Sequence, residues 1–293
     1  MDKVLMAEVN ISEGTNIDLV NEVKEALLSV DSIEVIDIDS NGDHNRTVFT
    51  YKGNPELVLE ATKRLAKKAI ELIDMTKHKG QHPRMGAVDV VPFIPVKNYT
   101  TEEAVEIAKR FGKFLGELGV PVYYYEDAQE KEYRKSLPKI RKGQYEALEE
   151  KMKDEKWQPD EGPKDFNAKS GATVTGARFP LVAFNINLET DNLEIGKKIV
   201  KSVRAATGGF TYIRAIALKL EDKNQVQVSM NMVNYEKTPI HGVYETIKSE
   251  ANRYNVHIHD TELVGPVPLY ALRDVLDFYI KISNTFSMDQ IYS

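Results

Sequence analysis

The sequence predicts an α+β protein made of two subdomains that share one order of elements. Apolar segments typical of strands alternate with amphipathic stretches typical of helices in the order β-α-β-β-α-β, once before and once after residue 178. This is the order of the split βαβ, ferredoxin-like fold. At 293 residues the chain also exceeds the usual size of one domain. We therefore expect two ferredoxin-like α/β subdomains, residues 1–178 and 179–293, whose mixed sheets face a shared ligand cleft.

The first subdomain is expected to contain strands at about 3–10, 33–39, 46–52 and 88–96, and helices at about 17–30 and 55–75. Asn54 before Pro55 is a typical helix start, because the side chain caps the helix and proline at the first position loses no hydrogen bond. A further helix at about 101–118 leads to a strand at about 120–125. Pro92 and Pro95 predict that the strand at 88–96 lies at a sheet edge, or that the prolines occupy strand ends.

The second subdomain is expected to have strands near 179–188, 211–220, 225–232 and 257–264, with helices near 192–205 and 239–254. The two halves share element order but show no residue-level repeat. Between them, residues 126–171 predict one or two short helices followed by a loop-like run from Trp157 to Pro163. A long loop in a compact protein is usually functional or disordered, and this one lies where the two subdomains would meet.

Composition limits the classes of function. With 39 basic and 45 acidic residues, the net charge of -6 argues against general affinity for nucleic acid or anionic membranes, although a local basic pocket could still bind an anionic substrate. The chain has no cysteine, which excludes disulfides, thiol nucleophiles and thiolate metal sites. Residues 1–10 resemble a first strand more than a signal peptide, and no apolar run is long enough to span a bilayer. We expect a cytoplasmic protein.

The run His78–Asp89 concentrates two histidines, an arginine, an aspartate and two glycines in a segment that cannot be a regular helix. Pro83 favours extended backbone at His82, so the imidazole is presented from a shaped loop. Two histidines four residues apart present metal ligands only on a helix, which Gly80 and Pro83 oppose, so no metal site is predicted. Acid–base work by one histidine is favoured over metal binding. A histidine that only bonds loop carbonyls fits these residues equally well.

Other polar residues also follow predicted strands. Asp37 and Asp39 share one face of a strand end, where a carboxylate could fix the imidazole tautomer or contact a substrate amine; a solvated turn acid is the commoner alternative. Asn10 and Ser12 could contact a ligand or simply form a turn. The small-residue stretch 162–178 would let a flat ligand approach backbone amides, and Arg178 at its end could bind a carboxylate in a planar fork. A plain linker is equally compatible.

Several of these segments, in this order, resemble the formiminotransferase family, whose members occur alone or as the front half of a bifunctional formiminotransferase-cyclodeaminase. The resemblance covers essentially the whole chain, and the histidine run is its most specific part. The segments that carry it are 9–14, 45–48, 78–96, 171–178, 184–188 and 227–231. It implies transfer of the formimino group from N-formimino-L-glutamate to N5 of tetrahydrofolate, releasing glutamate, in histidine degradation. It also implies a homodimer, and we expect no cyclodeaminase module after Ser293.

The resemblance also assigns residues. It implies that His82 is the catalytic histidine, and we add Asp39 as its candidate partner. Folate-binding residues implied by the family are Gly162, Pro163, Lys164, Asp165, Phe166, Asn167, Ala168, Lys169, Ser170 and Gly171. Candidate substrate-binding residues are Asn10, Asn45, Arg46, Arg84 and Arg178. Ala7 and Val9 replace a cysteine and a proline of the family's first motif, and Ser170 replaces a frequent tryptophan, which puts an aromatic contact to folate from that position in doubt.

The chemistry fits these residues. Attack of a secondary amine on an amidine carbon requires removal of one proton and delivery of another, which one imidazole can do in turn without a metal. Two alternatives remain open. N-formyl-L-glutamate could be the donor, since the amide and the amidine differ only by O against NH. From another class, the chain could be a non-catalytic folate-binding protein or an RNA-binding ferredoxin-like protein, although it shows no clear RNP-type aromatic motif.

Overall fold

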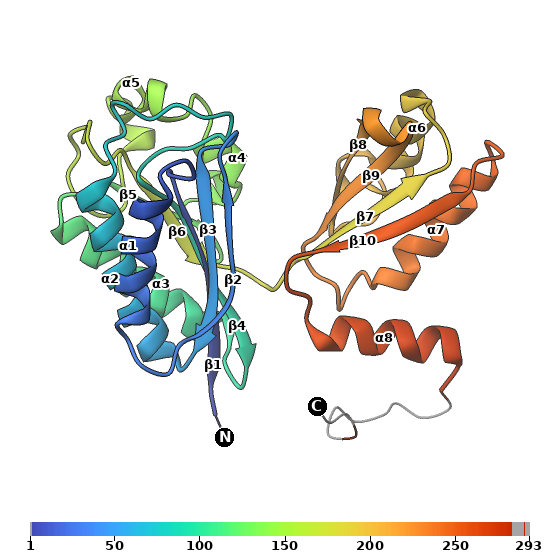
Figure 1. Cartoon of the computed structure of the whole chain (residues 1–293), viewed down its shortest axis with the longest axis horizontal. Coiled ribbons are helices and arrows are strands. Elements are labelled where there is room, and N and C mark those ends of the chain that lie inside the picture. The colour runs from blue at the N-terminus through green and yellow to red at the C-terminus, as the bar shows by residue number, and fades with distance from the viewer. Residues whose placement is uncertain (1, 283–289, 291–293) are drawn as a thin grey trace. The chain divides into compact units, whose positions relative to one another are not determined.

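The computed structural model describes residues 2–282 and Gln290, and the chain divides into two compact units, Met1–Arg178 and Phe179–Ser293 (Figure 1). The division falls at Arg178, where the sequence analysis ends its first subdomain. Each unit holds one β-sheet with helices packed on it, which confirms the α+β class with two subdomains. Within the described residues, no helix combines the length and apolar character needed to cross a bilayer. The expectation of a shared cleft stays a prediction.

The first unit has a six-stranded sheet in the order β2-β3-β1-β4-β6-β5. Its strands are β1 Val4–Ile11, β2 Glu34–Asn41, β3 Arg46–Gly53, β4 Val88–Lys97, β5 Val122–Glu126 and β6 Thr173–Ala177. The first four pair antiparallel, as a ferredoxin-like unit requires, while β6 and β5 extend the sheet in parallel with β4. Strand β6 was not predicted from the sequence, because the five small, buried residues of this strand show neither alternation nor a long apolar run.

Strand β4 lies in the interior of this sheet, so the prediction that Pro92 and Pro95 place it at an edge is wrong. It pairs with β1 on one side and with β6 on the other. The ladder with β6 covers only residues 90–93, so Pro95 lies beyond it, and the ladder with β1 shifts register between Val4 and Leu5, opposite Lys97 and Pro95. Prolines are tolerated where a ladder ends or is irregular.

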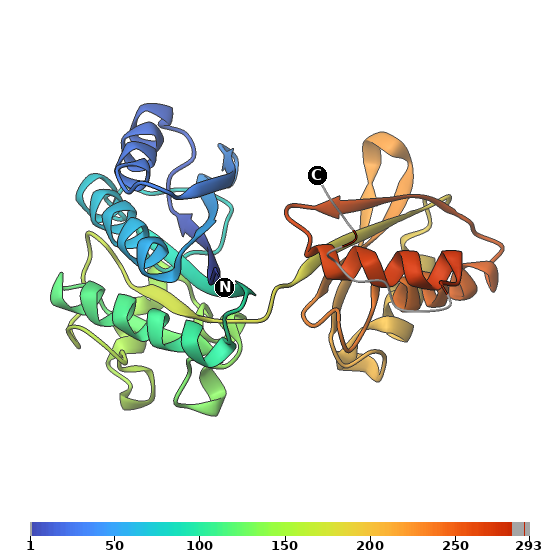
Figure 2. The same cartoon turned by 90° about the horizontal axis from the view of Figure 1, so that it is seen from below.

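Helices α1 Ile17–Leu28, α2 Pro55–Leu72 and α3 Thr101–Glu117 cover one face of the sheet (Figures 1 and 2). Asn16, Asn54 and Thr100 cap their first turns, and Thr100 forms a capping box with Glu103. Apolar residues of all three helices pack against alternate strand residues such as Val9 and Phe49. This core holds the strand ends that carry the polar loops.

The connection between β5 and β6 folds onto the opposite face of the sheet. It contains η1 Glu132–Arg134, α4 Leu137–Ile140, η2 Tyr145–Ala147, α5 Leu148–Met152 and η3 Glu155–Trp157. Its apolar residues pack with Val90, Tyr123 and Tyr125, whereas Tyr124 points into the helix-covered core. The predicted short helices are therefore present, and they place this connection beside the start of β4.

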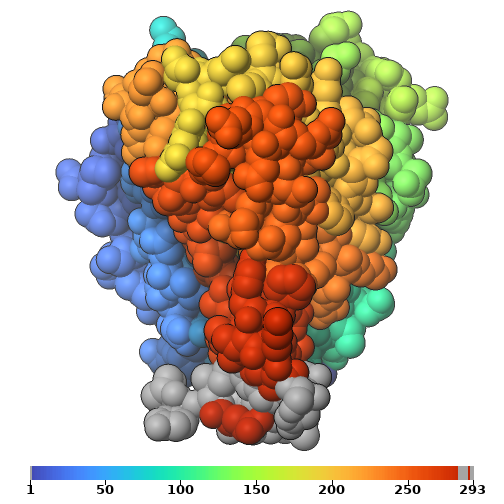
Figure 3. Space-filling view, turned by 90° about the vertical axis from the view of Figure 1, so that its right-hand side faces the viewer, coloured from blue at the N-terminus to red at the C-terminus, as the bar shows by residue number. Residues whose placement is uncertain are grey.

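The second unit has a four-stranded antiparallel sheet in the order β10-β7-β9-β8, the same order as the first four strands of unit one. Its strands are β7 Val182–Leu188, β8 Ile213–Leu220, β9 Gln225–Met232 and β10 Ile258–Val264; its helices are α6 Leu193–Val203, α7 Ile240–Asn252 and α8 Leu269–Ile280, with short η4 Ala205–Thr207 and η5 Glu221–Lys223. Helix α8 (red in Figure 3) was not predicted; it buries Ala271 but exposes Leu269, Tyr270, Leu276, Phe278 and Ile280.

Candidate active site

The histidine loop leaves α2 at Ile73 and runs without regular helix to the start of β4. Residues 79–81 of this loop are hydrogen-bonded to the turn between β2 and β3. The Gln81 amide donates to the Asp43 carbonyl at 3.2 Å, and Asn45 Nδ2 donates to the Lys79 carbonyl at 2.8 Å. A Cβ at Gly80 would lie 2.4 Å from the His44 carbonyl oxygen, so this close approach requires glycine. The loop is non-helical, as Gly80 and Pro83 predict.

Residues 85–87, at the end of the histidine loop, are hydrogen-bonded to Ser170 in the predicted folate-binding stretch 162–171 and to Ala172 directly after it. The Ala87 amide donates to the Ser170 carbonyl at 2.8 Å, and the Ala172 amide donates to the Met85 carbonyl at 3.0 Å. Gly171 has φ +65°, and a Cβ there would lie 2.1 Å from the Met85 carbonyl oxygen. Two segments far apart in the sequence therefore form one structural element, and only glycine fits at position 171 without a shift of the backbone.

His82 lies in a half-buried, electropositive position. Burial is the largest of the causes that together lower the pKa of the imidazole to about 4, and it is followed by the coulombic effects of Arg141, Arg46, His44 and Arg84 in that order. The ring centroids of His82 and His44 are 6.3 Å apart. His82 is therefore a neutral imidazole at pH 7, which is the form that can accept a proton.

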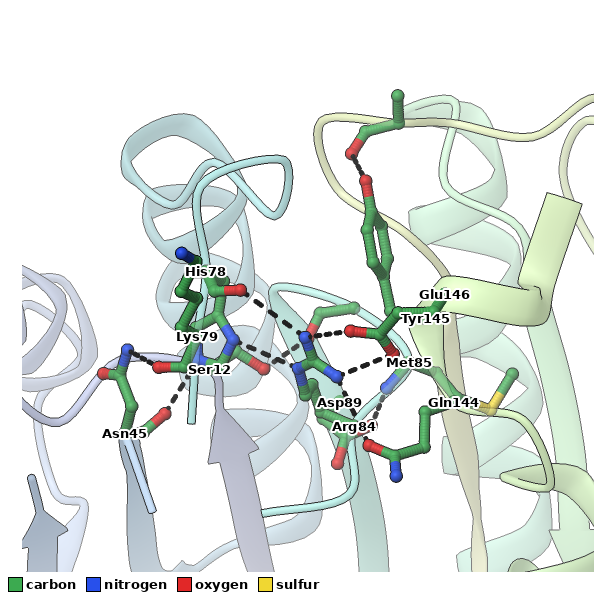
Figure 4. A network of polar contacts seen from close by, with 12 residues as sticks. Ser12, Asn45, His78, Lys79, Arg84, Met85, Asp89, Gln144, Tyr145 and Glu146 are labelled. Atoms are coloured by element: carbon green, nitrogen blue, oxygen red, sulfur yellow. Dashed lines mark hydrogen bonds and ion pairs between the residues drawn. The ribbon is translucent and has the colours of Figure 1, made fainter. Parts of the chain in front are cut away.

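The carboxylate beside His82 is Asp89, at the start of β4. Its Oδ2 lies 3.9 Å from His82 Nε2 and forms an ion pair with Arg141. Its Oδ1 accepts a 2.8 Å hydrogen bond from the Met85 amide (Figure 4). Burial raises the pKa of Asp89, whereas the guanidinium of Arg141 and the Met85 amide favour its ionised form. Among the described residues, Asp89 is the only carboxylate within 4 Å of His82 nitrogens.

Asp39 lies elsewhere on the same unit. Its side chain is 60% exposed on β2 and its Oδ2 is 3.5 Å from Arg46. Asp39 and Asn10 both pair with Val48, so they share the sheet face that α1, α2 and α3 leave uncovered. A catalytic role for Asp39 stays a prediction, because its ion pair is with Arg46 rather than with His82.

Arg84 connects the histidine loop to the β5–β6 connection (Figure 4). Its Nη atoms donate to both Glu146 carboxylate oxygens at 2.6 and 2.9 Å, and its Nε donates to His78 Nδ1 at 3.1 Å. His78 Nε2 in turn lies 2.9 Å from the Asn45 carbonyl. Since the side chain of Arg84 is only 7% exposed and these partners occupy it, the contacts favour a structural role over direct substrate binding.

The other candidate substrate-binding residues differ in how far the protein already occupies them. Asn45 accepts from the Gly14 amide at 2.9 Å and donates to Lys79, so both ends of its side-chain amide are in use. Arg178, at the end of β6, forms an ion pair with Glu8. Asn10 makes only a 3.5 Å contact to the Glu8 carbonyl. Asn10 is thus the member of this group with the weakest existing contact.

The predicted folate stretch is anchored by its own side chains. Asn167 donates to the Gly119 carbonyl at 2.9 Å and accepts from the Ser170 amide at 3.1 Å, while the Ala168 carbonyl accepts from the Tyr145 hydroxyl at 2.6 Å. Ser170 is 3% exposed, which places this position inside the unit. The stretch is therefore an ordered loop held against the histidine loop, and its role in folate binding stays a prediction.

Several buried polar atoms at His82 make no hydrogen bond within the part of the chain that the structure describes. They are Arg46 Nε, Arg141 Nε and His82 Nε2. Buried polar atoms without partners are rare and call for an explanation, and a cationic cluster of this kind suits an anionic ligand. Within the described residues, no group of three or more potential ligands is placed to hold a metal ion. The arrangement can accept a carboxylate and move a proton.

The sequence patterns gave no sign of Arg141 and did not pair Asp89 with His82. Asp89 carried a local signal, since it closes the histidine run. Arg141 carried none, because it follows α4 in a segment that no pattern connects to His82. On the second unit the sequence patterns also gave no sign of a row of hydrogen-bonded amides: Gln227 Nε2 donates to Asn187 Oδ1 at 3.0 Å, and Asn187 donates to Asp260.

Two family models and several known proteins match this chain over nearly its whole length. Residues 4–178 match the model of the formiminotransferase domain, N-terminal subdomain, and residues 183–291 match that of the formiminotransferase domain. The chain is 45% identical to glutamate formimidoyltransferase from Streptococcus pyogenes serotype M1, covering 97% of this chain and 95% of that protein. It is 45% identical to glutamate formimidoyltransferase from Thermoplasma acidophilum, covering 94% and 91%.

A longer relative shows the same correspondence. The chain is 42% identical to the formimidoyltransferase-cyclodeaminase of Rattus norvegicus. The match covers 99% of this chain and 55% of that longer protein. The two family models together cover nearly all residues of the chain. The two glutamate formimidoyltransferases match it at 45% identity over nearly their full length, which identifies its family. The chain belongs to the formiminotransferase family.

Proposed function

We propose that this chain transfers the formimino group from N-formimino-L-glutamate to N5 of tetrahydrofolate, giving 5-formiminotetrahydrofolate and L-glutamate in histidine degradation. Two relatives that are 45% identical over almost their whole length are glutamate formimidoyltransferases. The structural observation that carries the proposal is the neutral His82 imidazole beside Arg46 and Arg141, each of which has a buried Nε without a hydrogen bond among the described residues. Both substrates bear carboxylates, and the overall charge of -6 means that only such a local cluster can attract them.

In the proposed reaction, N5 of tetrahydrofolate attacks the formimino carbon and forms a new C–N bond, while His82 takes the proton from N5. The tetrahedral intermediate then collapses, the bond from carbon to the glutamate nitrogen breaks, and His82 returns the proton to that nitrogen. The imidazole ends neutral, as it began. Because its pKa is about 4, the protonated His82 is a strong acid and readily gives its proton to the departing amine.

We further propose that residues 162–171 bind folate. The Ser170 carbonyl accepts from the Ala87 amide and Gly171 pairs with Gly86, which supports a folate site next to the histidine loop, as transfer between two bound molecules requires. Arg46 and Asn10 are our first choices for substrate contacts, because Arg46 Nε has no partner and Asn10 has only one long contact. Arg178 remains a candidate that would have to exchange or share its ion pair with Glu8. From the family resemblance we further propose a cytoplasmic homodimer.

The test is a parallel assay of the purified protein with tetrahydrofolate and either N-formimino- or N-formyl-L-glutamate, with folate products identified by mass spectrometry. We expect turnover with the formimino donor, and a loss of two to four powers of ten in His82→Ala with folate binding retained. His78→Ala should lose less, since His78 is bonded to Arg84 and Asn45. Turnover with the formyl donor alone would assign the other reaction. Folate binding without turnover from either donor would refute the transferase.

A further inference from the structure

The buried carboxylate of Asp89 lies next to the His82 imidazole but has no role in the reaction described above. Both oxygens of the buried carboxylate have defined surroundings: Oδ1 accepts from the Met85 amide at 2.8 Å, and Oδ2 pairs with Arg141 and lies 3.9 Å from His82 Nε2. That imidazole nitrogen is buried and makes no hydrogen bond. At 3.9 Å the two atoms are too far apart for a hydrogen bond, but catalytic contacts in unliganded proteins are often long and tighten when substrate binds.

We propose that Asp89, held by Arg141 and the Met85 amide, positions His82 by accepting a hydrogen bond from Nε2–H, so that Nδ1 is the nitrogen that exchanges the proton with substrate. This inference rests on the proposed function for its catalytic part. Asp89 is a positioning residue here, because it acts through His82 and does not itself touch the reacting atoms.

The assignment of the two nitrogens follows from hydrogen-bond chemistry. A neutral imidazole has one N–H and one lone pair, and the partner of one nitrogen decides which is which. An ionised carboxylate only accepts, so a carboxylate beside Nε2 selects the Nε2–H form. The titratable and charged groups that act on His82 are Arg141, Arg46, His44 and Arg84, none of which is a carboxylate, so Asp89 is the carboxylate acceptor beside this ring among the described residues.

Arg141 is the cationic partner of Asp89 in the proposed positioning of His82. It stands directly after α4, where its amide donates to the Leu137 carbonyl at 2.9 Å, and its side chain is 15% exposed. A buried carboxylate without a cation would tend to protonate, and a protonated Asp89 could donate to Nε2 instead and reverse the tautomer. The β5–β6 connection therefore serves the histidine loop twice, through Glu146 on Arg84 and through Arg141 on Asp89.

The direct test measures the unmodified protein and uses a variant only to assign its signals. The ¹⁵N shifts of the His82 ring in the unmodified protein, assigned by their loss in His82→Gln, should report Nε2–H as the main neutral tautomer at pH 7. An Nδ1–H tautomer would overturn the proposal. This measurement is independent of activity: if neither glutamate donor is turned over but Nε2–H is found, the transferase assignment fails and the positioning contact stands.

The kinetic test uses Asp89→Asn with Asp43→Asn as its matched control. Both remove one negative charge, but Asp43 lies exposed in the β2–β3 turn. Loss of the carboxylate that fixes a catalytic histidine costs up to about 10⁴-fold in turnover in serine proteases. We expect Asp89→Asn to lower kcat by about 10²–10⁴-fold with KM within about threefold, a change in the His82 ¹⁵N shifts, and an unchanged Asp43→Asn.

Two outcomes would count against the positioning role. If active wild-type protein and folded Asp89→Asn shared the same kcat, His82 would not depend on the carboxylate. If Asp89→Asn lost activity through unfolding, circular dichroism would show it, and Arg141→Gln becomes the second variant. This variant keeps the carboxylate but removes its cation, and we expect lower kcat and a changed His82 tautomer ratio; an unaltered ratio with full activity would overturn the role of Arg141.

Discussion

Lowering the pH from 7.5 to 5.5 should leave kcat/KM for formimino transfer nearly unchanged, although an ordinary histidine base would lose most of its activity. The pKa of His82 is lowered from 6.5 to about 4 by burial and by the cations around it. At pH 5.5 a base with that pKa is still about 97% neutral, whereas one with pKa 6.5 is only about 9% neutral. The two cases differ about tenfold in the active form of the base.

The assay is the pH profile of kcat/KM, together with an NMR titration of the His82 ring protons in the free protein. His82 is one of six histidines, so His82→Gln identifies its signals. The substrates must be titrated alone under the same conditions, because their own ionisation also shapes the profile. An acid limb near pH 6.5 in both the rate and the His82 titration would refute the argument that burial and neighbouring cations keep this imidazole neutral.

The same shift predicts the sign of a stability effect. The unfolded chain binds a proton at His82 below about pH 6.5, whereas the folded chain does so only below about pH 4. The free energy of unfolding should therefore fall as the pH drops from 6.5 toward 4. His82→Gln should remove this part of the decrease, which urea unfolding at several pH values would measure. An identical pH dependence in both proteins would show that the folded and unfolded pKa values do not differ.

Three further predictions follow from the contacts of the site. Gly171→Ala should lower the free energy of unfolding by more than about 3 kcal/mol, because it adds a backbone clash to an unfavourable φ, whereas Gly119→Ala, at φ +80° in open space, should cost only about 1 kcal/mol in the same urea experiment. Arg84→Met should cost about 1–2 kcal/mol, since exposed Glu146 can return to water; a loss below about 0.3 kcal/mol would contradict its structural role. Arg178→Lys should raise KM for one substrate by about tenfold if the arginine forms a planar fork with a carboxylate, and unchanged kinetics would return it to its pair with Glu8.

Local patterns were sufficient for most elements of the fold. The helix at 55–75 was predicted from its cap and its apolar face, and Val58, Ala61, Leu65 and Ala69 are indeed buried on α2. Neither β6 nor α8 was predicted. Strand β6 is too short and too uniformly buried to show alternation. Helix α8 is as amphipathic as α1, so its pattern was present in the sequence and was overlooked.

The sequence by itself determined the order of the elements, the absence of thiol chemistry and the identity of the histidine loop, because periodicity, composition and the run from His78 to Asp89 are properties of neighbouring residues. It could not determine that β4 is an interior strand, since strand pairing depends on β1 and β6, which lie far away in the chain.

Only the tertiary structure decided which groups surround His82. Asp89 is a neighbour in sequence, but Arg141, the cation that favours its ionised form, comes from the connection that follows β5. Likewise, the joining of Gly86 and Gly171 requires two segments to meet whose sequences carry no sign of each other. The pKa of His82 is set by burial and by charges brought together in space, and neither is encoded in local sequence pattern.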